Sequence, residues 1–213
     1  MAGRDPLEES ELAGVFEALY RLRPKDGAMW RALFALGVGT GARISELLYL
    51  TRGQVIDSQG QIVRHLTFLK TKNGESRAVA VNPMVVPPLT AWLNEQAERG
   101  LQRKDTPLFV TSTGRRLGRT HASKILSAAL RAVCPDKRLG SHSMRKTYGK
   151  AIYLHYLARQ RAGENIEPLL KTMEAMGHKS VEATRRYLAF MLGNTDDAVM
   201  ALYPTLREKA GKG

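Results

Sequence analysis

The sequence has little of three things: cysteine, acidic side chains and long apolar runs. Its single cysteine, Cys134, cannot form an internal disulfide, which excludes a disulfide framework and a cysteine-based zinc site. The apolar runs are far shorter than the roughly 20 residues of a membrane-spanning helix, and residues 1–10 are polar, without the apolar segment of a signal peptide. We therefore expect a globular cytoplasmic protein without a membrane partner.

The shortage of acids leaves a large positive charge. The 213 residues include 33 lysines and arginines against 20 aspartates and glutamates, a formal net charge of +13. Such a charge favours a polyanionic partner, such as nucleic acid or an anionic membrane surface, although a basic protein without such a partner stays open. The apolar content of 43% is sufficient for one domain with a substantial core.

Helical periodicity dominates most of the chain. Apolar residues from Leu12 to Leu19 recur at helical spacing after Ser10, which we expect to cap a helix over 10–22. Cys134 continues the apolar stripe of a later helix, so we expect a packed core thiol. The same period predicts a helix after Pro83 and others at about 28–38, 43–50, 120–134, 142–160, 166–176, 179–192 and 195–203.

The centre of the chain has a different pattern. Residues 61–71 and 76–81 alternate and are rich in branched and aromatic types, with Asn73-Gly74 between them, a pair typical of a tight β-hairpin turn. Lys70 and Lys72 have the same strand parity and would project from one face near the turn. The sequence therefore predicts a mostly helical α+β fold with a small antiparallel sheet at one edge.

Three blocks of the sequence contain residues suited to phosphate chemistry. They are Gly41-Ala42-Arg43-Ile44-Ser45-Glu46-Leu47, then His142-Ser143-Met144-Arg145, then Gly177-His178-Lys179-Ser180 with Tyr187 nine residues after the histidine. An arginine stays charged and binds two phosphate oxygens at once, and a tyrosine is a nucleophile when cations and a base favour its ionised form. The order and spacing of these blocks, with the lysine hairpin between the first two, resemble the catalytic domain of tyrosine recombinases, the phage-integrase family.

The resemblance covers residues 7–192 and implies a role for each motif residue. Arg43 and Arg145 would hold the scissile phosphate, and Tyr187 would attack it to give a 3′-phosphotyrosine. His142 would assist proton transfer from the tyrosine, and His178 would hydrogen-bond the phosphate.

Two further residues complete the implied site. Lys72 would protonate the departing 5′-oxygen, with Lys70 as the alternative, or both are ordinary solvated lysines of an exposed strand. Glu46 matches the buried acid that orients the first arginine in this family, and a surface salt bridge is its alternative.

The resemblance also implies an overall activity and organisation. It implies a site-specific recombinase or integrase that needs no metal or nucleotide cofactor, acts on double-stranded DNA and self-associates there in a tetrameric synapse. We expect one catalytic domain over 1–213, with its core at 7–192 and a C-terminal helix and tail at 193–213, and no N-terminal core-binding domain in this chain. The terminal helix would pack on its own domain or on a neighbouring protomer. The long interval between Arg145 and His178 predicts a helix lengthened through Arg161.

Three other functions remain open. Gly37-x-Gly39-x-x-Ala42 satisfies a relaxed dinucleotide-binding fingerprint, but the preceding residues 30–36 favour a helix over the strand that this fingerprint requires. In the recombinase interpretation the glycines let the chain turn tightly so that Arg43 begins the next helix. A type IB topoisomerase-like enzyme would use the same residue types to relax DNA, and a non-catalytic DNA-binding module would not need the tyrosine.

Overall fold

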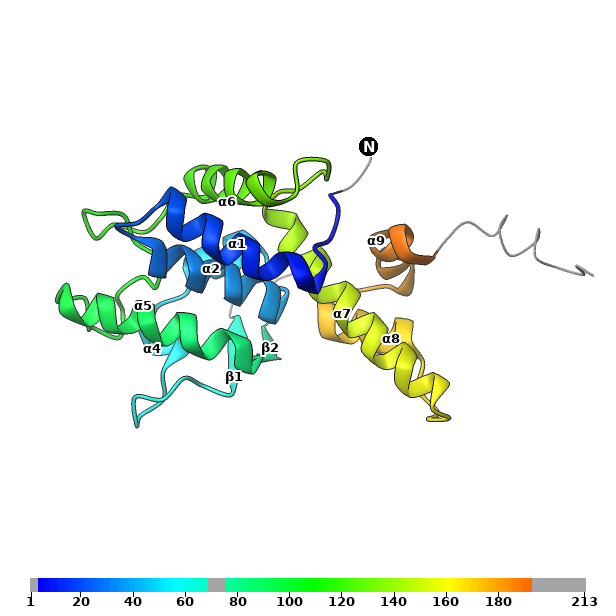
Figure 1. The fold of residues 1–213 in the computed structure, drawn as a ribbon. Helices are drawn as coiled ribbons and strands as arrows, with labels where there is room; N and C mark the ends of the chain where they lie inside the picture. Colours follow the sequence, from blue (N-terminus) through cyan, green and yellow to red (C-terminus); the bar gives the residue numbers. More distant parts are fainter. Residues whose placement is uncertain (1–3, 69–75, 193–213) are drawn as a thin grey trace, which may run out of the picture.

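The computed structural model describes residues 4–68 and 76–192 and shows the expected mostly helical α+β fold with a small antiparallel sheet (Figure 1). Each helix expected within these residues is present, and those expected with both bounds are shifted by no more than two residues; α4 was not expected. Lys70, Lys72 and the expected helix at 195–203 lie outside the described residues. The elements are α1 (Glu9–Leu22), α2 (Gly27–Thr40), α3 (Ile44–Tyr49), α4 (Arg52–Val55), β1 (His65–Phe68), β2 (Arg77–Ala80), the 3-10 turn Pro83–Val85, α5 (Val86–Glu98), α6 (Arg119–Val133), α7 (Ser141–Arg161), α8 (Pro168–Met176) and α9 (Val181–Leu192).

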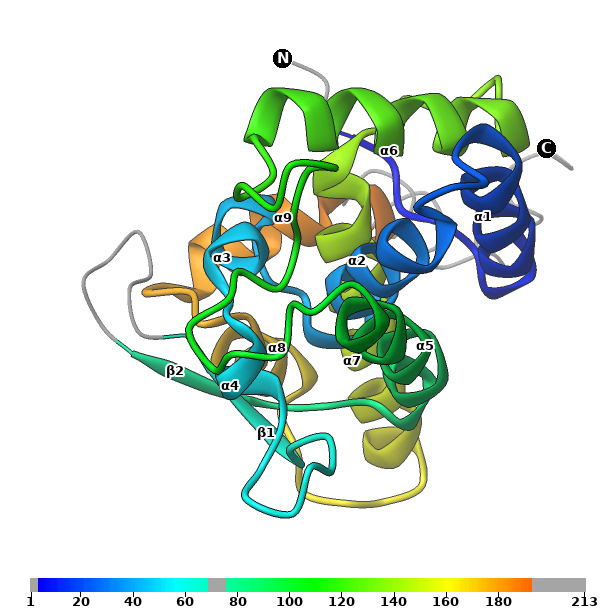
Figure 2. The same cartoon turned by 90° about the vertical axis from the view of Figure 1, so that its left-hand side faces the viewer.

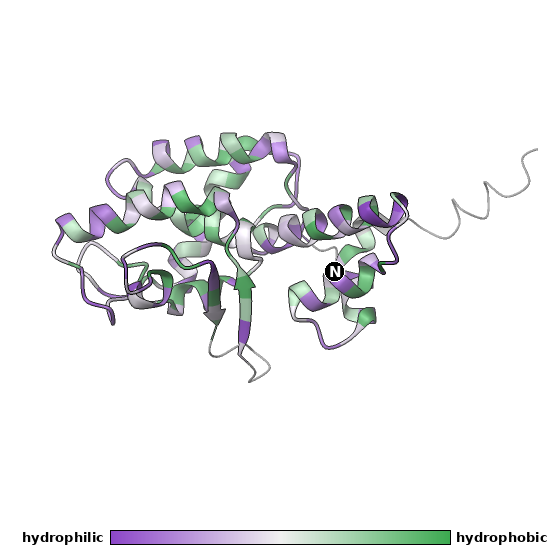
Figure 3. Ribbon diagram, turned by 90° about the horizontal axis from the view of Figure 1, so that it is seen from below, coloured by the Kyte–Doolittle hydropathy of each residue, from purple (hydrophilic) through white to green (hydrophobic). Residues whose placement is uncertain are grey.

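Helix α2 lies at the centre of the larger group of helices. It is apolar around most of its circumference, so it needs neighbours on every side, and α1, α5 and α7 pack against it. Helix α6 contacts α1 and lies at the end of the molecule opposite the two-stranded sheet (Figure 2). Apolar residues of this group face inward (Figure 3), and Cys134, at the end of α6, is buried as expected.

The first turn of α1 is capped differently from the prediction. Glu8 takes the cap position in place of Ser10, and its backbone N–H donates to the Glu11 carboxylate at 2.8 Å. Each carboxylate also has a distant cationic partner, with Lys150 Nζ 2.5 Å from Glu8 and Lys137 Nζ 2.6 Å from Glu11. Because these partners come from other parts of the chain, the local pattern around Ser10 could not reveal them.

The first strand begins later in the sequence than predicted, at His65, and the expected residues 69–71 lie outside the described part of the chain. Strands β1 and β2 are antiparallel, and Phe68 lies opposite Arg77 in the pair nearest the hairpin turn. The expected strand does not begin at residue 61, because the Asp57 carboxylate accepts hydrogen bonds from the backbone N–H of residues 59 and 61 and forms a turn there. Ile62 then pairs with Ile56 in an isolated bridge.

The glycines before Arg43 have two separate roles. Gly37 and Gly39 lie inside α2, where an added Cβ would stand 2.5 Å from Met144 Sδ and 2.4 Å from Val85 Cγ2 respectively. They therefore permit close packing, and the expectation that they form the tight turn is wrong. Of Gly37, Gly39 and Gly41, only Gly41 has a positive φ, 61°. Since a helix precedes Ala42, the strand required by the dinucleotide fingerprint is not found there.

Helix α7 passes from the larger group to a smaller one. Its buried residues all lie in its first half, up to Gly149, and none from Lys150 to Arg161 is buried. Helices α8 and α9 pack on α7 and on each other (Figure 1). The helix continues to Arg161, as the long interval predicted. Within 4–68 and 76–192, no helix is long and apolar enough to cross a membrane.

Candidate active site

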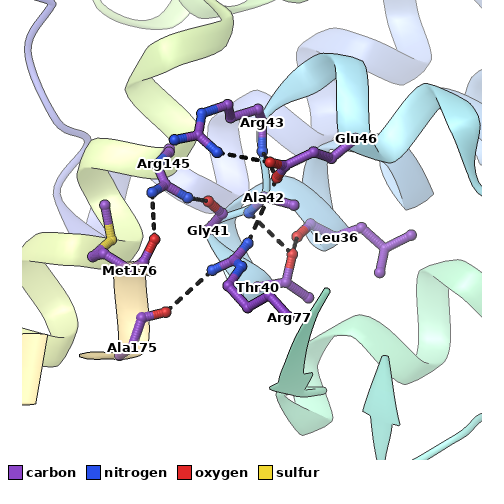
Figure 4. Close-up of polar contacts among 10 residues, drawn as sticks. All are labelled: Leu36, Thr40, Gly41, Ala42, Arg43, Glu46, Arg77, Arg145, Ala175 and Met176. Carbon is purple, nitrogen blue, oxygen red and sulfur yellow. Dashed lines mark hydrogen bonds and ion pairs between the residues drawn. The ribbon is translucent and has the colours of Figure 1, made fainter. Parts of the chain in front are cut away.

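The chain turns sharply between α2 and α3, and this turn positions Arg43. Gly41 is in the left-handed region, and a Cβ there would lie 2.3 Å from Tyr148 Cδ1, so glycine is required for two reasons. The buried Thr40 hydroxyl accepts a hydrogen bond from the Ala42 N–H at 3.3 Å and donates to the backbone of α2 (Figure 4). The turn is thereby fixed immediately before Arg43.

Arg43 caps α3 and is held by Glu46 one turn later. Its Nη1 donates to Glu46 Oε1 at 2.7 Å, and its backbone N–H donates to Oε2 at 2.8 Å. The Glu46 side chain is only 4% exposed, so this pair is not the surface salt bridge that remained open. The Arg43 side chain is 25% exposed, so the buried carboxylate orients an arginine that still reaches the surface.

Arg145 joins two parts of the site. It is 3% exposed, and its Nη1 and Nη2 donate to the carbonyl oxygens of Gly41 and Met176, each at 2.5 Å (Figure 4). Burial and the nearby charge of Arg43 lower its pKa to about 10. Arg145 therefore stays cationic at neutral pH while it connects the turn before α3 to the end of α8.

His142 lies in the first turn of α7, three residues before Arg145. Its side chain as a whole is exposed, yet partial desolvation and then the charges of Arg145 and Arg43 lower its pKa. A histidine with a lowered pKa is neutral at pH 7 and able to accept a proton.

His178 follows Gly177, whose left-handed φ of 61° ends α8. Its Nδ1 lies 3.0 Å from Thr184 Oγ1, which fixes the ring orientation. Desolvation and the charges of Arg145 and Arg43 lower its pKa to about 4. The ring is therefore neutral at pH 7.

Tyr187, on α9, packs against His178 with ring centroids 5.4 Å apart and ring planes at 70°. Gly149 leaves room for it, since a Cβ there would lie 3.2 Å from Tyr187 Cε1. The Tyr187 hydroxyl is buried and has no hydrogen-bond partner among the described residues. Burial raises the pKa of this phenol above its ordinary value, although Arg145 and Arg43 oppose the rise.

The structure brings together most of the residues singled out from the sequence. Both histidines and the tyrosine experience the charges of Arg43 and Arg145. No group of three or more histidine, cysteine, aspartate or glutamate side chains that could hold a metal ion occurs in the described part of the chain. The predicted lysine lies outside it. The residues brought together are Arg43, Glu46, His142, Arg145, His178 and Tyr187.

One residue of this cluster was missed in the sequence. Arg77, in β2, lies 3.6 Å from Glu46 and donates to the carbonyl of Ala175 at 3.1 Å (Figure 4). A signal was available, because Arg77 has the same strand parity as Val79, whose side chain is buried. An arginine on the inward face of a strand needs a buried partner.

Comparison with known proteins gives consistent results. The family model described as Phage integrase family matches residues 7–191. Tyrosine recombinase XerC of Pelobacter propionicus is 27% identical over 180 residues, which cover 84% of this chain and 52% of that protein. XerH bound to a palindromic difH substrate has a TM-score of 0.65 at 23% identity, covering 93% of this chain and 53% of the other. XerA recombinase has a TM-score of 0.64 at 20% identity, covering 97% and 66%. The chain spans about half the length of the curated relatives it matches.

Proposed function

We propose that this chain, which belongs to the phage integrase family, is the catalytic domain of a site-specific DNA recombinase or integrase that cleaves and rejoins strands through a 3′-phosphotyrosine. The observation that carries the proposal is that four of the motif residues lie close enough to interact. The charges of Arg43 and Arg145 act on each other, on His178 and on Tyr187. These residues come from α7, α9 and the turns before α3 and α9. Burying Arg145 beside a second arginine is costly, and a bound anion between the two cations would offset that cost.

Double-stranded DNA is the proposed substrate. The formal net charge of +13 suits a polyanion, and the XerH relative is described in complex with its difH DNA substrate. We further propose that the protein acts in the cytoplasm, associated with the nucleoid when bound to DNA, and self-associates there in a tetrameric synapse.

The arginines would stabilise the charge of the reaction. A phosphodiester is already negative, and attack places further charge on its nonbridging oxygens. Arg43 is oriented by Glu46 and partly exposed, so its guanidinium can donate to the phosphate without leaving its partner. Arg145 is preorganised by two carbonyls, which leaves its other N–H groups to face the phosphate.

The remaining steps are proton transfers and one covalent exchange. The Tyr187 oxygen forms the bond to phosphorus while the bond to the 5′-oxygen breaks. The 3′ end of the cleaved strand therefore stays joined to the enzyme through its phosphate. The phenol proton passes to His142, and Lys72 gives a proton to the departing 5′-oxygen. His178 is neutral, so it can donate a hydrogen bond to the phosphate from the ring nitrogen that does not contact Thr184.

A pool of nicked duplexes with randomised core sequences tests the proposed function. After cleavage beside the nick, the short 5′-hydroxyl fragment diffuses away and the covalent complex accumulates on denaturing gels. We expect the wild type to form this complex and Tyr187→Phe to form none, with DNA binding changed by less than about tenfold because one hydroxyl adds little to a phosphate-dominated affinity.

The results of this experiment distinguish the proposed recombinase from its alternatives. Covalent complex in the Phe variant overturns the role of Tyr187, and none in the wild type indicates a DNA-binding module. Sequencing the trapped DNA identifies the core site. Strand exchange between two such sites then distinguishes a recombinase from an enzyme that only relaxes supercoils.

The general acid needs a separate test. We expect Lys72→Ala to cleave ordinary DNA at least about 100-fold more slowly. A 5′-bridging phosphorothiolate should restore its rate, because the sulfur leaves without a proton. Lys70→Ala is the matched control, and rescue of that variant instead would assign the acid to Lys70.

A further inference from the structure

Arg77 begins β2, at the end of the sheet nearest the hairpin turn, and lies on the inward face of the strand. It is the residue opposite Phe68 in the sheet, and its guanidinium carbon lies 5.5 Å from the centroid of the Phe68 ring. The Arg77 side chain is only 12% exposed. An arginine at a solvated strand end would extend into water, so its burial requires an explanation.

The Arg77 side chain reaches the α8–α9 turn. Its Nη1 donates to the carbonyl of Ala175 at 3.1 Å, in the last turn of α8. Gly177 makes room for it, because a Cβ there would lie 2.8 Å from Arg77 Cδ. The residue after Gly177 is His178, so Arg77 contacts the segment that positions this histidine.

The other end of the guanidinium faces Glu46. Arg77 Nη2 lies 3.6 Å from Glu46 Oε2, and it has no hydrogen-bond partner among the described residues. Glu46 already accepts two hydrogen bonds from Arg43. The same carboxylate therefore lies between two arginines, one of which reaches the surface while the other is buried.

The charges around this carboxylate suit the proposed reaction. Arg43, Arg77 and Arg145 carry three positive charges and Glu46 carries one negative charge, which leaves a net charge of two positive. A phosphodiester under attack carries about two negative charges at its transition state. Without Arg77, the cluster would keep only one net positive charge.

On the basis of the proposed function, we propose that Arg77 is a positioning residue for strand cleavage, which ties β2 to Glu46 and to the α8–α9 turn and so holds Arg43 and His178 in one arrangement. Arg77 is not assigned a contact with DNA, because its side chain is buried behind Glu46 and Gly177. Its effect on the reaction passes through the residues that it touches.

The first experiment needs no DNA. The charged groups that lower the pKa of His178 are Arg145 of α7, Arg43 at the start of α3 and Arg77 of β2. In pH titrations of the His178 ring followed by NMR, we expect Arg77→Met to raise the pKa of His178 and Arg77→Lys to raise it less. A value in Arg77→Met equal to that of the wild type would overturn the proposal.

The matched control for this titration is Arg64→Met. Arg64 is an exposed arginine just before β1 in the same hairpin. Arg64→Met removes one positive charge, as Arg77→Met does, but from a position outside the cluster. The pKa of His178 should therefore not change in this variant.

The second experiment measures single-turnover formation of the covalent complex on the pool of nicked duplexes. We expect Arg77→Met to slow it about 10- to 100-fold, the effect of a misplaced catalytic group, and Arg77→Lys to recover part of the rate. DNA affinity should change less than about threefold, because a buried arginine neutralises no phosphate. A rate in Arg77→Met equal to that of the wild type overturns the proposal.

The two proposals fail in different ways. If the wild type forms no covalent complex, the proposed function fails, whereas the His178 titration still reports on Arg77. If Arg77→Met is unfolded at the assay temperature, Arg77→Lys decides the question, and a wild-type rate together with a wild-type pKa of His178 in that variant overturns the positioning role.

Discussion

Arg43 and Arg145 belong to a region that is packed differently from the one that carries the proposed nucleophile, Tyr187. Arg43 and Arg145 lie at the edge of the larger group of helices, whereas His178 and Tyr187 are carried by the smaller group of α8 and α9 (Figure 1). In α2, 12 of 14 residues are buried, so this helix is enclosed on all sides. In α8 only Pro168, Thr172 and Met176 are buried.

This difference indicates how the site is divided. The proposed phosphate-binding side is built into a continuous core, which makes its charges preorganised. The nucleophile side depends on a small packed surface, on α7, and on two arginines that donate to its backbone, Arg145 to Met176 and Arg77 to Ala175. Segments with few buried apolar contacts open locally at lower free energy than the core. We therefore expect the nucleophile side to open first.

Arg145 spans both regions, so its replacement should have the largest effect. Arg145→Ala should reduce cleavage at least about 100-fold through loss of a preorganised cation. It should also lower the free energy of unfolding by about 2–4 kcal/mol, because two buried carbonyls lose their donor. The measurements are covalent-complex formation and denaturant unfolding.

Arg43→Ala is the contrasting variant. Cleavage should fall to a similar extent, since the same phosphate loses a cation, while stability falls less because the Arg43 side chain is partly exposed. Equal stability losses in the two variants would contradict the assignment of Arg145 to the junction.

A matched pair of leucines compares the two regions directly. Leu33 of α2 and Leu188 of α9 are both fully buried. Leu33→Ala should lower the free energy of global unfolding by about 2–5 kcal/mol. Leu188→Ala should act mainly on local opening, so hydrogen exchange should accelerate in α8 and α9 and remain slow in α2. Uniform acceleration along the chain would show that the two regions unfold as one unit.

Gly41 tests the turn between α2 and α3, which positions Arg43 and accepts a hydrogen bond from Arg145. Gly41→Ala should cost about 2–4 kcal/mol, from an unfavourable positive φ and from the clash with Tyr148. Gly60→Ala is the control, because Gly60 has φ 77° and nothing within 4 Å of an added Cβ, and it should cost about 1 kcal/mol. Equal losses of unfolding free energy would mean that Tyr148 moves aside readily.

A further expected effect is a pH dependence of stability. The pKa of His178 falls from 6.5 to about 4 on folding, so between these values the unfolded chain binds more protons than the folded one. Stability is therefore fully present above pH 6.5 and decreases as the pH falls towards 4. Thermal unfolding of the wild type and His178→Asn across this window should show a shallower slope in the variant. A slope remains in that variant, because the pKa of His142 is also lowered.

Local pattern was sufficient for the helices and for part of the site. Apolar residues at helical spacing placed seven described helices to within two residues, because a helix buries one face whatever its partner. The position of Glu46 one turn after Arg43 was also local, and the two residues pair as expected. The prediction that Ser10 caps α1 was wrong. Glu8 takes that position, where ion pairs of Glu8 with Lys150 and of Glu11 with Lys137 stabilise the first turn.

What the sequence by itself determined is therefore most of the helices, the presence of a small antiparallel sheet and the residue types available for phosphate chemistry. Only the tertiary structure decided which of them meet. The Arg145 bond to Gly41 joins residues 104 apart, and the Arg77 bond to Ala175 joins residues 98 apart. A buried guanidinium must find acceptors wherever the fold supplies them, and no periodicity along the chain specifies a partner at such a separation.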